Sequence, residues 1–187
     1  MSAGKMNLAI FDLDGTLFDT GEVNYFAYRD ALLPFGIKLE HDYYIQKCNG
    51  RHYTEFLPVI MDCEENIEEV HRAKKYAYSK NLYRARKNIH LFEIIKCLKE
   101  TYYTAIVTTA SRRNTEDVLN YFKCSELFDY VISQENITKV KPDPQGFLMV
   151  MDYFDISPEH TVIFEDSDVG IKAARATGAA VIIVDKF

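Results

Sequence analysis

Residues 10–19 read IFDLDGTLFD and place two acidic side chains, Asp12 and Asp14, directly after the apolar run 8–11. An apolar run followed closely by Gly15 is typical of a buried strand that ends in a loop. Two carboxylates at a strand end repel each other and lose hydration, and a hard divalent cation such as Mg²⁺ relieves both penalties. The segment therefore predicts a metal-dependent catalytic loop. The alternative is an acidic turn in which aspartate has its ordinary loop role.

The composition limits the classes of protein to consider. The chain has 187 residues, of which 48% are hydrophobic and 27% charged, and this length fits one core with a small inserted subdomain. No apolar run has the length of a membrane span, and the N-terminal residues lack a secretory signal. The net charge of −6 and the absence of a long Lys/Arg block argue against nucleic acid as a partner. Four cysteines without a CxxC pair favour thiols packed in a reducing compartment, so we expect a cytoplasmic monomer that binds neither membrane nor nucleic acid.

Further apolar runs repeat the pattern of the first. Four candidate strands follow it along the chain, at residues 104–107, 128–132, 161–164 and 179–184. Helical patterns separate them, at residues 91–99, 114–122 and 169–176, the last followed by Gly178 as a C-terminal cap. Short apolar strands that alternate with helices predict an α/β fold, a three-layer Rossmann-like parallel sheet covered on both faces.

Residues 20–88 interrupt this alternation with helical patterns such as 23–33 and 67–86. Gly36 and the pair Asn49-Gly50 are typical of turns between helices. We predict that residues 1–19 and 89–187 form the core and that residues 20–88 form an inserted α-helical cap. The alternative is that these helices cover one face of the sheet.

Polar residues follow each predicted strand, and the carboxyl ends of parallel strands meet at one edge, where ligands bind. We therefore expect the polar clusters to form one site. The sequences that carry them are DLDGT at residues 12–16, the threonines at 108 and 109, KPDP at 141–144 and FEDSDVG at 164–170. In this order and over nearly the whole chain, these sequences resemble the haloacid dehalogenase-like superfamily of phosphotransferases, in particular its β-phosphoglucomutase and phosphoglycolate phosphatase-like group.

The resemblance implies a Mg²⁺-dependent phosphoric monoester hydrolase that acts on a small phosphorylated metabolite. Asp12 is implied as the nucleophile that forms an aspartyl-phosphate, and Asp14 as the general acid and base. Lys141 would supply positive charge to the phosphoryl group and to Asp12. The implied metal ligands are the carboxylates of Asp12 and Asp166 and the main-chain carbonyl of Asp14, with Glu165 in the metal shell directly or through water.

The resemblance also implies the residues that contact the substrate. Gly15 and Thr16 would offer backbone donors, and Thr109, with Ala110 beside it, would bind a phosphoryl oxygen. Thr108 remains an alternative to Thr109 because the register is uncertain by one residue. In the predicted cap, Arg51 resembles the Gly-Arg turn with which several family members contact the distal end of an anionic substrate, although a surface arginine in a turn is an open alternative.

Two other functions remain open. A sugar-phosphate mutase of the same superfamily would need a histidine in the first cap helix, where this sequence has Asn24. A binding module that has lost catalysis would have a broken catalytic position, and none is broken here. We therefore expect a phosphatase, with the identity of the metabolite left open.

Overall fold

The computed structural model describes residues 5–185, which divide into two compact units. One unit combines the N-terminal residues through Asp19 with those from Arg86 onward, and the other comprises Thr20–Ala85. The predicted insert extended to residue 88, three residues further than the observed division. The difference arises because Arg86–Lys87 forms a strand, β3, that pairs with β2 (Phe18–Asp19) in the first unit.

A five-stranded sheet forms the centre of the first unit, in the order β5-β4-β1-β6-β7. All four pairings between neighbouring strands are parallel, which confirms the predicted α/β fold. The strands are β1 (Asn7–Phe11), β4 (Tyr102–Val107), β5 (Tyr130–Ile132), β6 (Thr161–Glu165) and β7 (Ala180–Ile183). β1 lies in the middle and is buried almost throughout, as expected for an apolar strand with a helix layer on each side.

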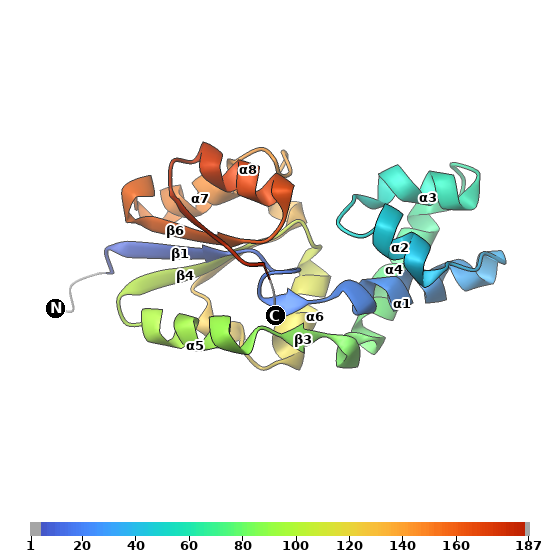
Figure 1. Ribbon diagram of the computed structural model, residues 1–187, viewed down its shortest axis with the longest axis horizontal. Coiled ribbons are helices and arrows are strands. Elements are labelled where there is room, and N and C mark those ends of the chain that lie inside the picture. Colours follow the sequence, from blue (N-terminus) through green and yellow to red (C-terminus); the bar gives the residue numbers. More distant parts are fainter. Residues whose placement is uncertain (1–4, 186–187) are drawn as a thin grey trace. The chain divides into compact units, whose positions relative to one another are not determined.

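Helices cover both faces of this sheet and complete three layers. Figure 1 shows α7 and α8 on one face and α5 and α6 on the other. Their bounds are α5 (Ile89–Leu98), α6 (Arg112–Tyr121), α7 (Gln145–Phe154) and α8 (Asp168–Ala176). Ser111 and Ser167 precede α6 and α8, and the hydroxyl of each accepts a backbone N–H of the first helical turn. These caps fix where each helix begins, directly after a strand end.

The second unit is helical throughout its main elements, α1 (Gly21–Leu32), α2 (His41–Lys47), α3 (Tyr53–Met61) and α4 (Ile67–Lys80). Its core is rich in aromatic rings, and the ring of Tyr28 lies edge-on to that of Phe56 with 5.0 Å between centroids. Short 3₁₀ helices occur in both units, at Leu33–Phe35, Leu82–Arg84, Ser125–Leu127, Gln134–Asn136 and Pro158–His160. Within residues 5–185, no helix combines the length and the apolar character that crossing a bilayer requires.

Candidate active site

The carboxyl ends of β1, β4 and β6 bring the predicted polar residues to one edge of the sheet. Asp12 follows β1 directly, Thr108 follows β4, and Glu165 is the last residue of β6. Asp12 is only 7% exposed, although it carries a carboxylate. Its backbone N–H donates to the carbonyl of Phe164 on β6, so the loop leaves the sheet while still bonded to the neighbouring strand.

The loop after β1 is shaped around the carboxylate of Asp166. Gly15 has a φ of +94°, in the left-handed region that favours glycine, and its N–H donates to the carbonyl of Phe18. A Cβ atom at position 15 would overlap the Asp166 carboxylate. The hydroxyl of Thr16 donates to Oδ1 of Asp166 at 2.8 Å. The bare glycine and the short hydroxyl therefore let two segments, 150 residues apart in sequence, approach closely.

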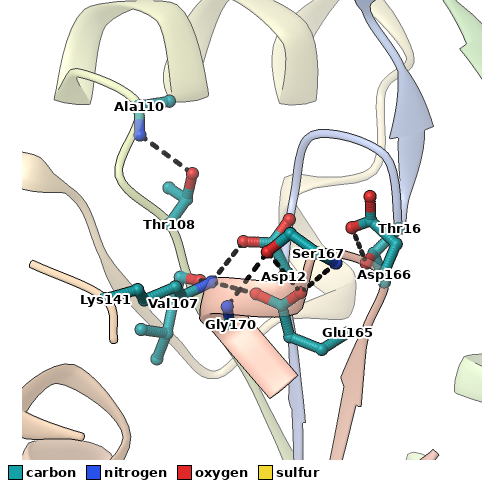
Figure 2. A network of polar contacts seen from close by, with 10 residues as sticks. All are labelled: Asp12, Thr16, Val107, Thr108, Ala110, Lys141, Glu165, Asp166, Ser167 and Gly170. Carbon is teal, nitrogen blue, oxygen red and sulfur yellow. Dashed lines mark hydrogen bonds and ion pairs between the residues drawn. The ribbon is translucent and has the colours of Figure 1, made fainter. Parts of the chain in front are cut away.

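Lys141 is the cation of this site. Its Nζ atom donates to Asp12 Oδ1 at 2.5 Å, to Glu165 Oε1 at 2.5 Å and to the carbonyl of Val107 at 3.2 Å. Figure 2 shows the ammonium between the two carboxylates. The Lys141 side chain is 7% exposed, so these interactions occur away from water, where charge-assisted hydrogen bonds are strong.

The charges of the site do not balance. Burial by itself would lower the pKa of Lys141, but the negative charges of Asp12 and Glu165 raise it, so the ammonium stays charged. Burial raises the pKa of the Asp12 carboxyl well above its usual range against the attraction of Lys141, and Glu165 and Asp166 add to the increase. Burial, with Glu165, also raises the pKa of Asp166 to about 6. Three carboxyl groups thus share one ammonium, which leaves a surplus of negative charge that another cation would neutralise.

The donor set fits Mg²⁺ with few protein ligands. In the described part of the chain, no group of three or more acidic, histidine or cysteine side chains is arranged to hold a metal ion. Mg²⁺ commonly binds through one or two carboxylates and keeps several waters. The carboxylates of Asp12 and Asp166, which repel each other electrostatically, would meet this requirement. Glu165 fits it less well, because Lys141 and Ser167 occupy both of its carboxylate oxygens.

The two threonines after β4 differ in their surroundings. Thr108 is 1% exposed, and its hydroxyl accepts the backbone N–H of Ala110 at 3.0 Å. Thr109 is exposed at the same strand end. Thr109 is thus the more accessible of the two, while the hydroxyl of Thr108 already accepts a hydrogen bond within the turn.

Two further residues of interest lie in the second unit. Arg51 is exposed in the turn between α2 and α3, and its N–H donates to the carbonyl of Cys48. Asn24, on α1, donates its side-chain amide to the backbone carbonyl of Thr20 at 3.2 Å, one helical turn away.

Sequence reasoning missed three groups that hold this site together. They are the carbonyl of Val107, which accepts from Lys141, Ser167, which donates to Glu165, and Gly170, which packs against the same carboxylate. Ser167 carries a detectable signal, a serine directly before a helix, but that signal indicates a cap and not its contact with Glu165. A backbone carbonyl leaves no trace in a sequence.

Comparisons with known proteins point to a single family. The profile of the haloacid dehalogenase-like hydrolase family matches residues 9–184. A phosphorylated carbohydrates phosphatase of Thermotoga maritima is 30% identical over 92% of this chain and 82% of its own length. The fructose-1-phosphate phosphatase YqaB of Escherichia coli is 28% identical over 90% of this chain and 91% of its own length. The crystal structure of a protein described as a β-phosphoglucomutase from Thermotoga maritima superposes with a TM-score of 0.80, at 25% identity, over 97% of this chain and 87% of the other.

Proposed function

Because the chain belongs to the haloacid dehalogenase-like hydrolase family, we propose that it is a Mg²⁺-dependent phosphatase that hydrolyses a small phosphorylated metabolite through an aspartyl-phosphate on Asp12. The observation that carries the proposal is the buried Asp12 carboxylate, held by Lys141 beside Asp166 at the carboxyl edge of the sheet. A buried, oriented carboxylate with an adjacent ammonium suits attack on a phosphate, whose own negative charge repels nucleophiles.

In this mechanism, a carboxylate oxygen of Asp12 attacks phosphorus while the bond from phosphorus to the ester oxygen breaks. Asp14 gives its proton to the leaving oxygen and then takes a proton from the water that hydrolyses the aspartyl-phosphate. Lys141, Thr109 and the backbone N–H groups after Asp14 stabilise the phosphoryl oxygens as charge develops on them. The carboxylates of Asp12 and Asp166 and the main-chain carbonyl of Asp14 would hold Mg²⁺, which would neutralise negative charge at the phosphate.

We also propose that the helical unit acts as a cap that selects the substrate, with Arg51 binding its distal anionic end. The names of the two curated relatives support phosphorylated sugars as the first substrates to test. The four cysteines, Cys48, Cys63, Cys97 and Cys124, are free thiols, which supports a reducing compartment and hence the cytoplasm. We propose a monomer.

A sugar-phosphate mutase is the second candidate, since one structural neighbour is described as a β-phosphoglucomutase. Asn24 stands at the position where the mutases carry histidine, and its amide does not act as an acid or a base near neutral pH. The amide also donates to the backbone carbonyl of Thr20, directly before its own helix. This supports hydrolysis over transfer to a second sugar. A binding module without catalysis is the least supported reading, because the Asp12–Lys141 pair is intact.

The test is hydrolysis of a panel of sugar phosphates, phosphoglycolate, pyrophosphate and nucleotides, with Mg²⁺ or with EDTA. We expect the wild type to release phosphate only with Mg²⁺. Asp12→Asn should abolish phosphate release from every substrate, because an amide is a poor nucleophile. Its circular dichroism spectrum should remain that of the wild type. Conversion of a sugar monophosphate to its isomer without phosphate release would favour the mutase. Unchanged hydrolysis by Asp12→Asn would exclude the proposed mechanism.

A further inference from the structure

Glu165 is the most completely buried charged residue of the site, with no exposed surface. Its Oε1 atom accepts from Lys141 Nζ at 2.5 Å. Its Oε2 atom accepts from both the backbone N–H and the hydroxyl of Ser167, at 2.8 and 3.1 Å (Figure 2). Each carboxylate oxygen therefore has protein donors.

The first turn of α8 encloses this carboxylate. The hydroxyl of Ser167 accepts the backbone N–H of Gly170 at 3.1 Å while it donates to Glu165. A Cβ atom at position 170 would overlap Oε1 of Glu165, so only glycine allows the helix to approach this closely. Ser167 and Gly170 thus fix the position of a side chain that comes from the preceding strand.

The ammonium of Lys141 in turn has one acceptor for each of its N–H groups. An ammonium carries three N–H groups, and the three acceptors are Asp12 Oδ1, Glu165 Oε1 and the carbonyl of Val107. Glu165 and Val107 belong to the scaffold of the sheet, whereas Asp12 is the proposed nucleophile. The two scaffold acceptors therefore determine where the ammonium stands relative to the nucleophile.

A metal-ligand role for Glu165 would disrupt this arrangement. Oε2 accepts two hydrogen bonds from Ser167, so Mg²⁺ there would displace a buried donor of α8. Oε1 accepts from Lys141 alone, and Mg²⁺ on the same atom would stand beside the ammonium and repel it. Asp166 differs, because among the described residues Thr16 is the one side chain that donates a hydrogen bond to it. The two adjacent acids are therefore not equivalent.

We propose that Glu165 is not a metal ligand but a positioning residue, anchored by the first turn of α8, that holds the ammonium of Lys141 against Asp12. The inference rests on the proposed function, since it assigns a role within that same site. Ser167 and Gly170 are positioning residues that act through Glu165. Motif position alone would place Glu165 and Asp166 together in the metal shell; the hydrogen bonds separate them.

The first measurement follows Lys141 directly and needs neither metal nor substrate. Limiting acetic anhydride acetylates accessible uncharged amines, and mass spectrometry reports the extent of labelling at Lys141. Glu165→Gln keeps the size of the side chain and removes the charge that holds the ammonium, so labelling of Lys141 should rise about tenfold, or about 1.4 kcal/mol. Asp166→Asn is the matched control: it removes a charge of the same site that makes no hydrogen bond to Lys141, so it should raise labelling less than Glu165→Gln does. Ser167→Ala, a milder change, should raise labelling in the same direction as Glu165→Gln.

The second measurement is calorimetric titration with Mg²⁺ in the absence of substrate. Asp166→Asn should weaken Mg²⁺ binding about tenfold or more, and Glu165→Gln should change it by less than about threefold. Glu165→Gln should also lower kcat at saturating Mg²⁺ by about 100-fold, the scale of a lost electrostatic contact.

The outcomes separate the two proposals. Wild-type labelling of Lys141 in both Glu165→Gln and Ser167→Ala, or equal loss of Mg²⁺ affinity in Glu165→Gln and Asp166→Asn, would overturn the positioning role. If the wild type neither binds Mg²⁺ nor hydrolyses any phosphate ester, the proposed function fails, and the labelling experiment still decides whether Glu165 holds Lys141.

Discussion

Two glycines at the site are explained by carboxylates and not by turns alone. Gly15 leaves room for Asp166, and Gly170 leaves room for Glu165. In each case the missing side chain lets a backbone segment approach an acid from a different element. The positions of Asp166 and Glu165 thus depend on the absence of a Cβ atom at Gly15 and Gly170.

Gly15→Ala should therefore damage the metal site as well as the loop. The new Cβ would overlap the Asp166 carboxylate, and the φ of +94° costs any L-residue about 1–2 kcal/mol. We expect a lower melting temperature and a concentration of Mg²⁺ for half-maximal activity raised about tenfold or more. Thermal unfolding and Mg²⁺ titration of activity measure the two effects.

Gly178→Ala is the matched control in the same unit. Gly178 has a φ of +82°, and its Cβ would meet Pro158 at 3.8 Å, an ordinary contact distance. This variant should lose stability by a similar backbone penalty and keep the Mg²⁺ requirement of the wild type. An equal shift in Mg²⁺ requirement for both variants would show that the overlap with Asp166 has no role.

Among the elements, those with strong apolar runs were predictable from sequence. The strand over residues 161–164 was expected, and β6 exceeds it by the single residue Glu165. The helix at 145–154 is not among the predicted elements, although its buried residues Phe147, Val150 and Met151 follow helical spacing. The apolar residues Leu148 and Tyr153 on its exposed side weaken that pattern. The two-residue strands β2 and β3 are too short to show a pattern of alternating hydrophobicity. Because β3 pairs with β2, the helical unit ends at residue 85, where the sequence predicted 88.

The residues of the site were predictable as a set but not as a network. The position of each polar residue after a strand predicts that Asp12, Thr109 and Glu165 lie at one edge of the sheet. The pairing of Lys141 with Glu165, 24 residues away, depends on the path of a loop that carries no periodic signal. The family resemblance implies that Glu165 joins the metal shell directly or through water, and the sequence does not show the hydrogen bonds that link Glu165 to Lys141 and α8.

A stacked histidine joins two helices of the second unit. The ring of His71 on α4 lies 3.7 Å from that of Tyr53 on α3, at an interplanar angle of 8°. Within the described part of the chain, no group hydrogen-bonds the buried Nδ1 atom of His71. Burial, together with the positive charges of Lys75 and Lys74, lowers the pKa of His71 to about 4.

This pKa predicts acid sensitivity of a definite sign. Between about pH 6.5, where an unfolded histidine titrates, and pH 4, the unfolded chain binds a proton that the folded chain does not. The free energy of unfolding therefore falls as the pH falls through this range. Partial exposure of His71 reduces the effect. Between pH 7 and pH 5, we expect the free energy of unfolding to fall by about 1 kcal/mol less in His71→Phe than in the wild type. Urea unfolding at the two pH values measures this difference.

His41 supplies a control of opposite sign. Its hydrogen bond to Glu22 raises the pKa of His41, so the stabilisation is present at low pH and is lost as the pH rises. His41→Phe should therefore not reduce the acid sensitivity. The same acid-induced loss in His71→Phe and the wild type would contradict the assignment of a neutral, stacked His71.

At the scale of the whole molecule, the helical unit is an insertion whose two ends lie next to each other in the first unit. The chain leaves the first unit at Asp19 and re-enters it at Arg86, and these two residues are paired across β2 and β3. Their side chains also form an ion pair. Because the two ends of the insertion meet, the sheet and its strand-end residues form a unit that the insertion does not interrupt. This arrangement supports the proposal that the core carries out the chemistry and the inserted unit selects the substrate.

The charge of the whole chain makes the local cations decisive. A protein with a net charge of −6 repels a phosphate dianion at long range. Lys141 alone does not offset the three carboxyl groups around it, as the raised pKa values of Asp12 and Asp166 indicate. Mg²⁺ would supply the remaining positive charge at the point where Asp12 meets the phosphate.

The covalent intermediate on Asp12 is tested most directly with p-nitrophenyl phosphate and the Asp14→Asn variant. The p-nitrophenolate leaving group needs no proton, so the first step should proceed, while the second should stall without a base to activate water. We expect a rapid release of one p-nitrophenolate per chain and a phosphoryl group on the peptide that contains Asp12, found by mass spectrometry. Release without a phosphorylated chain, or a phosphoryl group on another residue, would contradict the aspartyl-phosphate on Asp12.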